Sequence, residues 1–97
     1  MNGRNGFLIV TRHSGAVEWL HRKGITGEVV SHISPSESLE GKIVIGNIPL
    51  WVAAQADEVW AIEIPNLPSE LRGVDISAEQ MEELGAKISK YYVQKLD

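Results

Sequence analysis

The sequence predicts an α/β fold: a small, mainly parallel sheet of about four strands, flanked by helices, in one domain. Three observations predict it. The length of 97 residues suits a single domain. Apolar residues make up 43% and charged residues 23%, which is the balance of an ordinary globular protein. Short β-branched runs alternate with stretches of helical periodicity, as in β-α-β units. We therefore expect residues 1–97 to form one Rossmann-like domain.

The first β-α-β unit is predicted from residues 7–33. The run FLIVT over 7–11 is continuously apolar and β-branched, which is typical of a strand buried on both faces. A helix is expected over 16–23, with Ser14 as its N-cap and Gly24 as its stop. A second strand is expected over 28–33.

The middle of the chain repeats this pattern. Residues 34–41 are a loop by composition, and a third strand is expected over 42–45. Pro49 is placed to open a short helix over 50–56, a favourable position for proline. A fourth strand is expected over 58–64.

The C-terminal part is predicted to be a loop followed by a helix. Residues 65–73 contain two prolines and are expected to be irregular. Ser77 and Gln80 have the spacing of a capping box, which predicts a helix start. Gly85 would lie inside this last helix at a cost of about 1 kcal/mol. The apolar stripe of the helix would comprise Met81, Leu84, Ile88, Tyr91 and Tyr92.

Charge and composition exclude several classes of protein. The net charge is −4, and residues 50–97 hold nine acidic against four basic residues, so we expect no binding of long nucleic acid. The absence of cysteine excludes disulfides and thiolate zinc sites. No apolar stretch approaches the roughly 20 residues that span a bilayer, and residues 1–6 do not resemble a signal peptide. We expect a soluble, cytoplasmic protein without membrane contact.

Candidate functional residues follow the ends of the predicted strands. In parallel sheets, ligands bind beyond the carboxyl ends of the strands, near helix N-termini. Imidazole groups gathered there can move protons near neutral pH. Guanidinium groups can hold an oxyanion. The residues expected at this rim are Thr11, Arg12, His13, Ser14, Gly15, His32, Gly46, Asn47, Arg72 and Gly73.

Each candidate also has a purely structural interpretation. Arg12 and His13 could form a solvated turn, and His32 could be a half-buried histidine of the second strand. Arg72 could pair with neighbouring acids, and His21 is expected at the surface. The tryptophans are expected to be core or dimer contacts rather than base-stacking platforms; they are Trp19, Trp51 and Trp60.

Cofactor and metal chemistry are poorly supported. The histidine spacings match no metal motif, and no G-x-G-x-x-G follows the first strand, so we expect neither a metal nor a cofactor. The strand-end sequence Thr11-Arg12-His13 resembles the Arg-His-Gly-Glu of histidine phosphatases, which would make the protein a phosphomonoesterase. Ser14 and Gly15 depart from that motif, and the chain is short for that family.

A broader resemblance covers nearly the whole chain. The string TRHSGAVEWL over 11–20, followed by Lys23-Gly24-Ile25, resembles the short CRISPR-associated proteins of the Csx-sixteen family, found with type III systems. Ser14 departs from it, since that family often has proline there. Further matches in the same order are VSH over 30–32, KIVIG over 42–46, Pro49 with Ala53-Ala54, PSELRG over 68–73, residues 81–86, Tyr91 and Val93.

The resemblance implies a ring nuclease that cleaves cyclic oligoadenylate, above all cyclic tetraadenylate, and so switches off antiviral signalling. It also implies a Rossmann-like fold similar to that of CARF domains, and a homodimer. RNA can be cut without metal when its own 2′-hydroxyl attacks the adjacent phosphorus.

On this hypothesis Arg12 clamps the scissile phosphate and His13 moves a proton, with support from His32 or Arg72. Asn47 beside Gly46 would contact adenine or ribose. The remaining substrate-binding candidates are Thr11, Ser14, Gly15 and Gly73.

Besides the phosphomonoesterase, two further alternatives remain open. The same rim could bind cyclic oligoadenylate without cutting it, which would make the protein a sponge or a sensor. The chain could also be an assembly protein whose acidic final helix contacts a larger effector.

Overall fold

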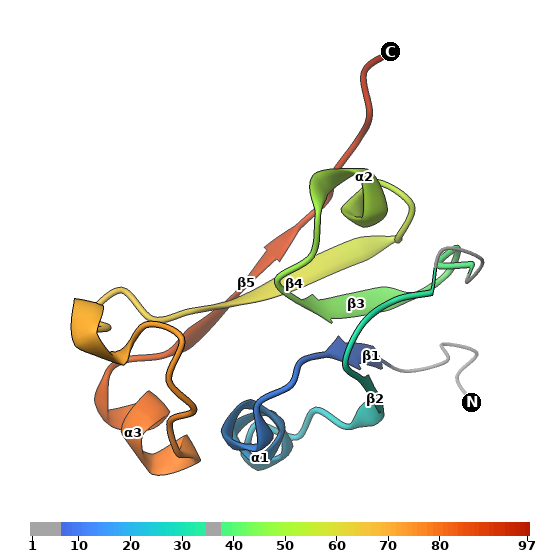
Figure 1. Ribbon diagram of the computed structural model, residues 1–97. Coiled ribbons are helices and arrows are strands. Elements are labelled where there is room, and N and C mark those ends of the chain that lie inside the picture. The colour runs from blue at the N-terminus through green and yellow to red at the C-terminus, as the bar shows by residue number, and fades with distance from the viewer. Residues whose placement is uncertain (1–6, 35–37) are drawn as a thin grey trace.

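One sheet of five strands organises the protein, in the order β2-β1-β3-β4-β5 (Figure 1). The computed structural model describes residues 7–34 and 38–97. The predictions for residues 1–6, and those parts of the predicted loop that fall on 35–37, lie outside the described residues.

The strands are parallel except the last, which pairs antiparallel to its neighbour. Their bounds are β1 Phe7–Val10, β2 Gly27–Val30, β3 Ile43–Gly46, β4 Glu58–Glu63 and β5 Lys87–Tyr91. The helices are α1 Ser14–Arg22, α2 Leu50–Ala53, the 3₁₀ turn η1 Ser69–Leu71 and α3 Ala78–Glu83.

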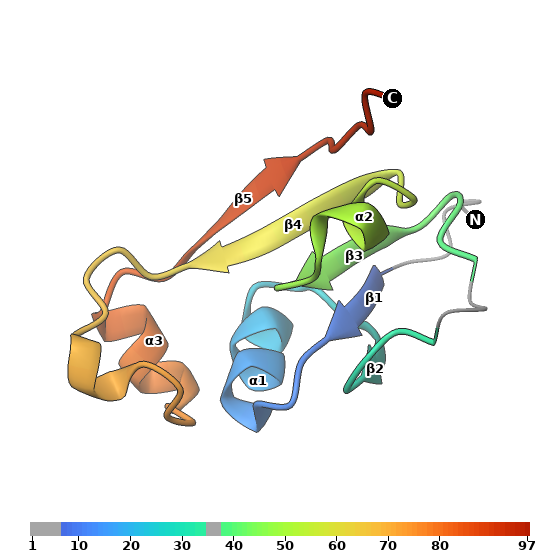
Figure 2. The same cartoon turned by 45° about the horizontal axis from the view of Figure 1, so that its top comes forward.

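Both faces of the central strands β1 and β3 are covered. Alternate residues of a strand point to opposite faces, and accordingly Leu8 and Val44 pack with α2 while Ile9 and Ile45 pack with α1 and α3. Figure 2 shows α2 on one side of the sheet and α1 on the other. The predicted small, mainly parallel, Rossmann-like α/β fold is confirmed, with one strand more than expected.

Several predicted boundaries shift. The second strand ends at Val30, so His32 lies beyond the strand and is exposed. Helix α1 begins at Ser14 itself, its N-cap is His13, and no side chain caps it. The N-cap prediction for Ser14 is therefore wrong. Helix α2 ends at Ala53, three residues earlier than expected.

The predicted final helix is wrong beyond Glu83. The capping box of Ser77 and Gln80 is present and starts α3. Gly85 then ends the helix at φ +80°, with its amide bonded to the Glu82 carbonyl and the next amide bonded to Met81. This arrangement is a Schellman motif, for which glycine is the favoured residue. The chain leaves it as strand β5 along the edge of β4.

Polar contacts tie α3 to α1. The Trp19 indole donates to Glu82 Oε1 at 2.8 Å, and Lys23 Nζ lies 3.0 Å from the same oxygen. Arg22 pairs with Glu79 at 2.8 Å. Because these contacts fix α3 against α1, they also fix the segment that leads into α3.

The three tryptophans have different environments. Trp19 is buried in the core, as expected. Trp60 is half-buried. The centroids of the Phe7 and Trp60 rings are 4.8 Å apart, and Lys90 Nζ lies 4.3 Å from the centroid of the Trp60 ring. Trp51 is 65% exposed on α2, so it is not a core residue of this chain.

The contact between α1 and α3 predicts sensitivity to acid. The hydrogen bond from Trp19, then that from Lys23, lowers the pKa of Glu82 below its ordinary value of 4.5. A carboxylate with a lowered folded-state pKa stabilises the fold above its unfolded pKa, and this stabilisation disappears as pH falls through the folded pKa. We expect Glu82→Gln to flatten the fall in melting temperature below about pH 4.5.

The measurement is thermal unfolding by circular dichroism at a series of pH values. Glu83→Gln is the matched control, because it removes one exposed carboxylate from the same helix. A Glu82→Gln curve that runs parallel to the wild-type curve through the acid range would contradict the prediction.

Candidate functional site

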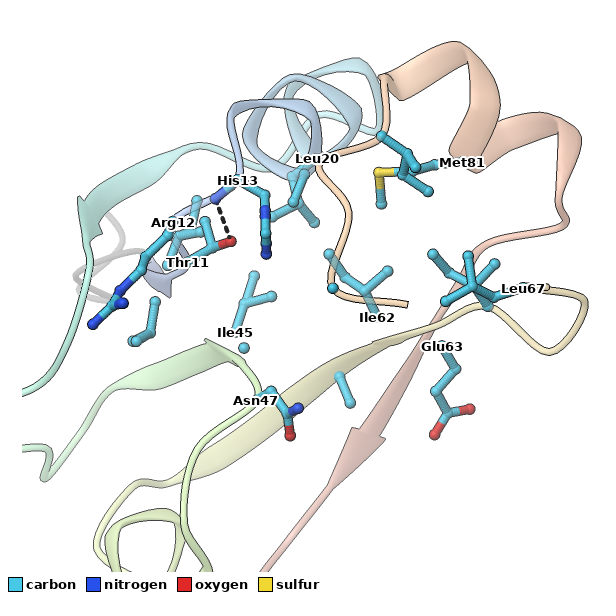
Figure 3. A pocket seen from close by; sticks show the side chains of 18 of the residues that line it. Thr11, Arg12, His13, Leu20, Ile45, Asn47, Ile62, Glu63, Leu67 and Met81 are labelled. Carbon is cyan, nitrogen blue, oxygen red and sulfur yellow. Dashed lines mark hydrogen bonds between the residues drawn. The ribbon is translucent and has the colours of Figure 1, made fainter. Parts of the chain in front are cut away.

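A cavity of about 640 Å³ opens beyond the carboxyl ends of β1, β3 and β4 (Figure 3). After β1 the chain crosses through α1 to β2 on one side, whereas β3 lies on the other side of β1. The cavity is therefore at the point where the strand order reverses, the position at which open α/β sheets bind ligands.

The cavity has a polar end and an apolar end. The polar end lies at the ends of β1 and β3 and carries Thr11, Arg12, His13, Ser31 and Asn47. The apolar end lies where β4 leads into the long connection to α3. It is formed by Ile62, Ile64, Leu67, Leu71, Ile76 and Met81.

The structure brings together most of the residues predicted from the sequence. Those that line the cavity are Thr11, Arg12, His13, Gly46, Asn47 and Gly73. Ser14 lines a shallower depression beside it, together with Arg12, His13 and His21. Gly15, His32 and Arg72 line neither hollow. His32 instead has its Nδ1 3.3 Å from Ser31 Oγ, and its proposed role stays a prediction.

The corner between β1 and α1 sets the direction of its side chains. The Thr11 amide donates to Val30 at 2.9 Å, and Thr11 Oγ1 accepts from the His13 amide at 3.1 Å. The backbone at His13 is extended, so neighbouring side chains point apart. Figure 3 shows the His13 ring directed into the cavity and the Arg12 side chain directed away from that ring.

The N-terminus of α1 faces this corner without a side-chain cap. No acidic residue lies in its first turn, and His13 makes no capping bond. The first amides of a helix have no partner within the helix and favour negative charge. The arrangement beside Arg12 and His13 suits an anionic ligand group.

Gly15 permits a close contact between α1 and the chain that leads into α3. The residue is buried, and a Cβ at this position would lie 1.9 Å from the Ile76 carbonyl oxygen. Backbone therefore packs directly on the first turn of α1. This packing accounts for the glycine, whose predicted substrate contact stays a prediction.

Asp75 is a residue beside the site that sequence reasoning missed. Its Oδ1 lies 3.2 Å from His13 Nδ1, and the two side chains are 56% and 51% exposed. Asp75 precedes Ile76, so the contact of Ile76 with Gly15 brings the carboxylate to the imidazole. No local motif signals this pair, because the two residues are far apart in the chain.

Glu63 is a carboxylate that lines the cavity. The hydroxyls of Ser89 and Tyr91 on β5 donate to its two oxygens. These hydrogen bonds, that of Ser89 first, lower the pKa of Glu63, and the carboxylate raises the pKa of Tyr91. The sequence reasoning assigned β5 to a helix and so could not place these hydroxyls beside β4.

Within 7–34 and 38–97, no group of three or more histidine, aspartate or glutamate side chains could hold a metal ion. No helix in this part of the chain has both the length and the apolar character needed to cross a bilayer.

Comparison with known proteins gives one family. A family model described as "Putative CRISPR-associated protein (Cas_VVA1548)" matches residues 8–94. The match extends over every residue that lines the cavity. Neither a curated protein nor a solved structure matches the chain.

Proposed function

The chain belongs to this family of CRISPR-associated proteins, and on that premise we propose that it is a ring nuclease. The substrate is cyclic tetraadenylate, the signal that the resemblance to the Csx-sixteen family implies. The products are linear diadenylates that end in a 2′,3′-cyclic phosphate, and their formation switches off type III antiviral signalling.

The division of the cavity into two ends supports this proposal most strongly. A nucleotide has a charged phosphate and a flat, largely apolar base. The phosphate matches the polar end, where Arg12 and the uncapped start of α1 lie together. The base matches the apolar end around Leu67, Leu71 and Met81. Asn47 can read adenine, because its amide both donates and accepts hydrogen bonds.

The reaction is an internal transesterification at phosphorus. The ribose 2′-oxygen attacks, its bond to phosphorus forms, and the bond from phosphorus to the 5′-oxygen breaks. His13 Nε2 takes the proton of the 2′-hydroxyl, and the same imidazolium returns a proton to the departing 5′-oxygen. Two such cuts convert the ring into two diadenylates, with no oxidant, reductant or water consumed.

Arg12 stabilises the charge of the phosphorane in this proposal. Its guanidinium lies on the far side of the corner from the His13 ring, and its side chain lines both hollows. Rotation of this long, exposed side chain brings it to a phosphate at the start of α1. In that position the guanidinium donates to the charge that develops on the phosphorane, and donors to developing charge usually contribute strongly to catalysis.

A homodimer is the active unit in the proposal. The substrate ring has rotational symmetry, so a two-fold dimer presents the same patch to opposite phosphates.

The test is to incubate the purified protein with cyclic tetraadenylate in excess EDTA and to separate the products by chromatography and mass spectrometry. Linear diadenylate with a 2′,3′-cyclic phosphate is the expected product. Intact ligand that co-elutes with the protein would replace the proposal by a sponge or sensor. Intact ligand without binding would remove the nucleotide function altogether.

A further inference from the structure

Asp75 and His13 form a pair that the proposed chemistry does not yet use. Their side chains come from distant parts of the chain, and Asp75 Oδ1 lies 3.2 Å from His13 Nδ1. An imidazole bonded to a carboxylate through one nitrogen has its ring orientation and its tautomer fixed. From this geometry we propose that Asp75 is the positioning residue for His13; the inference rests on the proposed nuclease function for its kinetic consequence.

In the proposal, His13 Nδ1–H donates to Asp75 across this distance, and that donation determines which nitrogen can act as a base. With Nδ1 protonated and donating to Asp75, the lone pair of neutral His13 is on Nε2. The ring points into the cavity (Figure 3), so Nε2 faces the space where a ligand would lie. A ring with the opposite tautomer would present an N–H there and could not accept a proton.

Three features hold the pair together. Thr11 Oγ1 accepts from the His13 amide at 3.1 Å and fixes the backbone on one side. Ile76 packs against Gly15 and fixes the segment that carries Asp75 on the other side. The ion pairs between α1 and α3 hold the two segments in place relative to each other. Asp75 therefore approaches His13 because of packing around it, although both side chains are half-exposed.

The tautomer of His13 tests this inference without any need for activity. Two-bond ¹⁵N–¹H NMR correlations of histidine-labelled protein report which ring nitrogen carries the proton. The His13 signals are assigned by their loss in His13→Ala. We expect the Nδ1–H tautomer in the wild type and a shift toward Nε2–H in Asp75→Ala. Glu70→Gln is the matched control, since it removes an exposed carboxylate from the same connection without contact to His13.

Single-turnover kinetics provide the second readout. Asp75→Ala should slow cleavage by between about 10-fold, as for other orienting partners, and 10⁴-fold, as for a triad carboxylate. Ligand affinity should change little. Because Asp75 acts through His13, the double variant His13→Ala/Asp75→Ala should be no slower than His13→Ala alone.

The outcomes separate the two proposals. An unchanged His13 tautomer in Asp75→Ala, or additive rate losses in the double variant, would overturn the role of Asp75. Failure of the wild type to cleave cyclic tetraadenylate would remove the nuclease proposal, whereas the NMR comparison would still decide whether Asp75 positions His13.

Discussion

Arg12→Ala is expected to lower the single-turnover rate of ring cleavage by about 10²–10³-fold, the usual loss when one donor to a developing oxyanion is removed. Arg12 is exposed and lines the cavity, so its loss should leave the melting temperature unchanged. Arg12→Lys should recover only part of the rate, because an ammonium group cannot make the paired contacts of a guanidinium.

Lys95→Ala is the matched control for charge. It removes one exposed positive group outside the cavity and should cleave at the wild-type rate. If Arg12→Ala cleaves as fast as this control, Arg12 is not the phosphate clamp, and the anion site must be sought elsewhere on the rim.

Gly15→Ala is expected to have the largest effect on stability at the site. The new methyl group would lie 1.9 Å from the Ile76 carbonyl oxygen, and neither backbone can yield without separation of α1 from the segment before α3. Overpacking of this kind costs about 1–3 kcal/mol in the free energy of unfolding. The same separation would withdraw Asp75 from His13, so cleavage should fall as well.

Urea unfolding measures the first effect, with Ser14→Ala as the control, because it changes a side chain at the exposed start of α1 without adding an atom at the contact with Ile76. A Gly15→Ala protein as stable as the wild type would show that the contact with Ile76 relaxes freely. That result would contradict the account of how the segment carrying Asp75 is held.

Local sequence signals predicted the parts of the fold that depend on short-range physics. The buried run of β1 and the capping box of Ser77 and Gln80 each have a direct local cause. The prediction for the last element was wrong because the spacing of Met81, Leu84 and Ile88 also fits the apolar stripe of one continuous helix. Gly85 was the informative residue: its φ of +80° ends the helix, and the chain gains strand pairing with β4 instead.

The residues of the candidate site likewise fall into two groups: those with a local sequence signal and those placed by tertiary packing. Arg12, His13 and Asn47 were predicted because each follows a buried strand whose end must lie at one edge of the sheet. Asp75 and the Ser89 hydroxyl that bonds Glu63 were not predictable, since tertiary packing alone brings them from the C-terminal part of the chain to His13 and Glu63. His32 was placed at the rim by a strand that in fact ends at Val30.

The most direct test of the central claim compares cyclic tetraadenylate with its 2′-deoxy analogue under identical single-turnover conditions. Both rings carry the same phosphates and bases, so the wild-type protein should bind both. Only the ribose ring supplies the attacking hydroxyl, so the account predicts cleavage of that ring and none of the analogue. Cleavage of both rings at similar rates would contradict it, because the nucleophile would then come from water or from the protein.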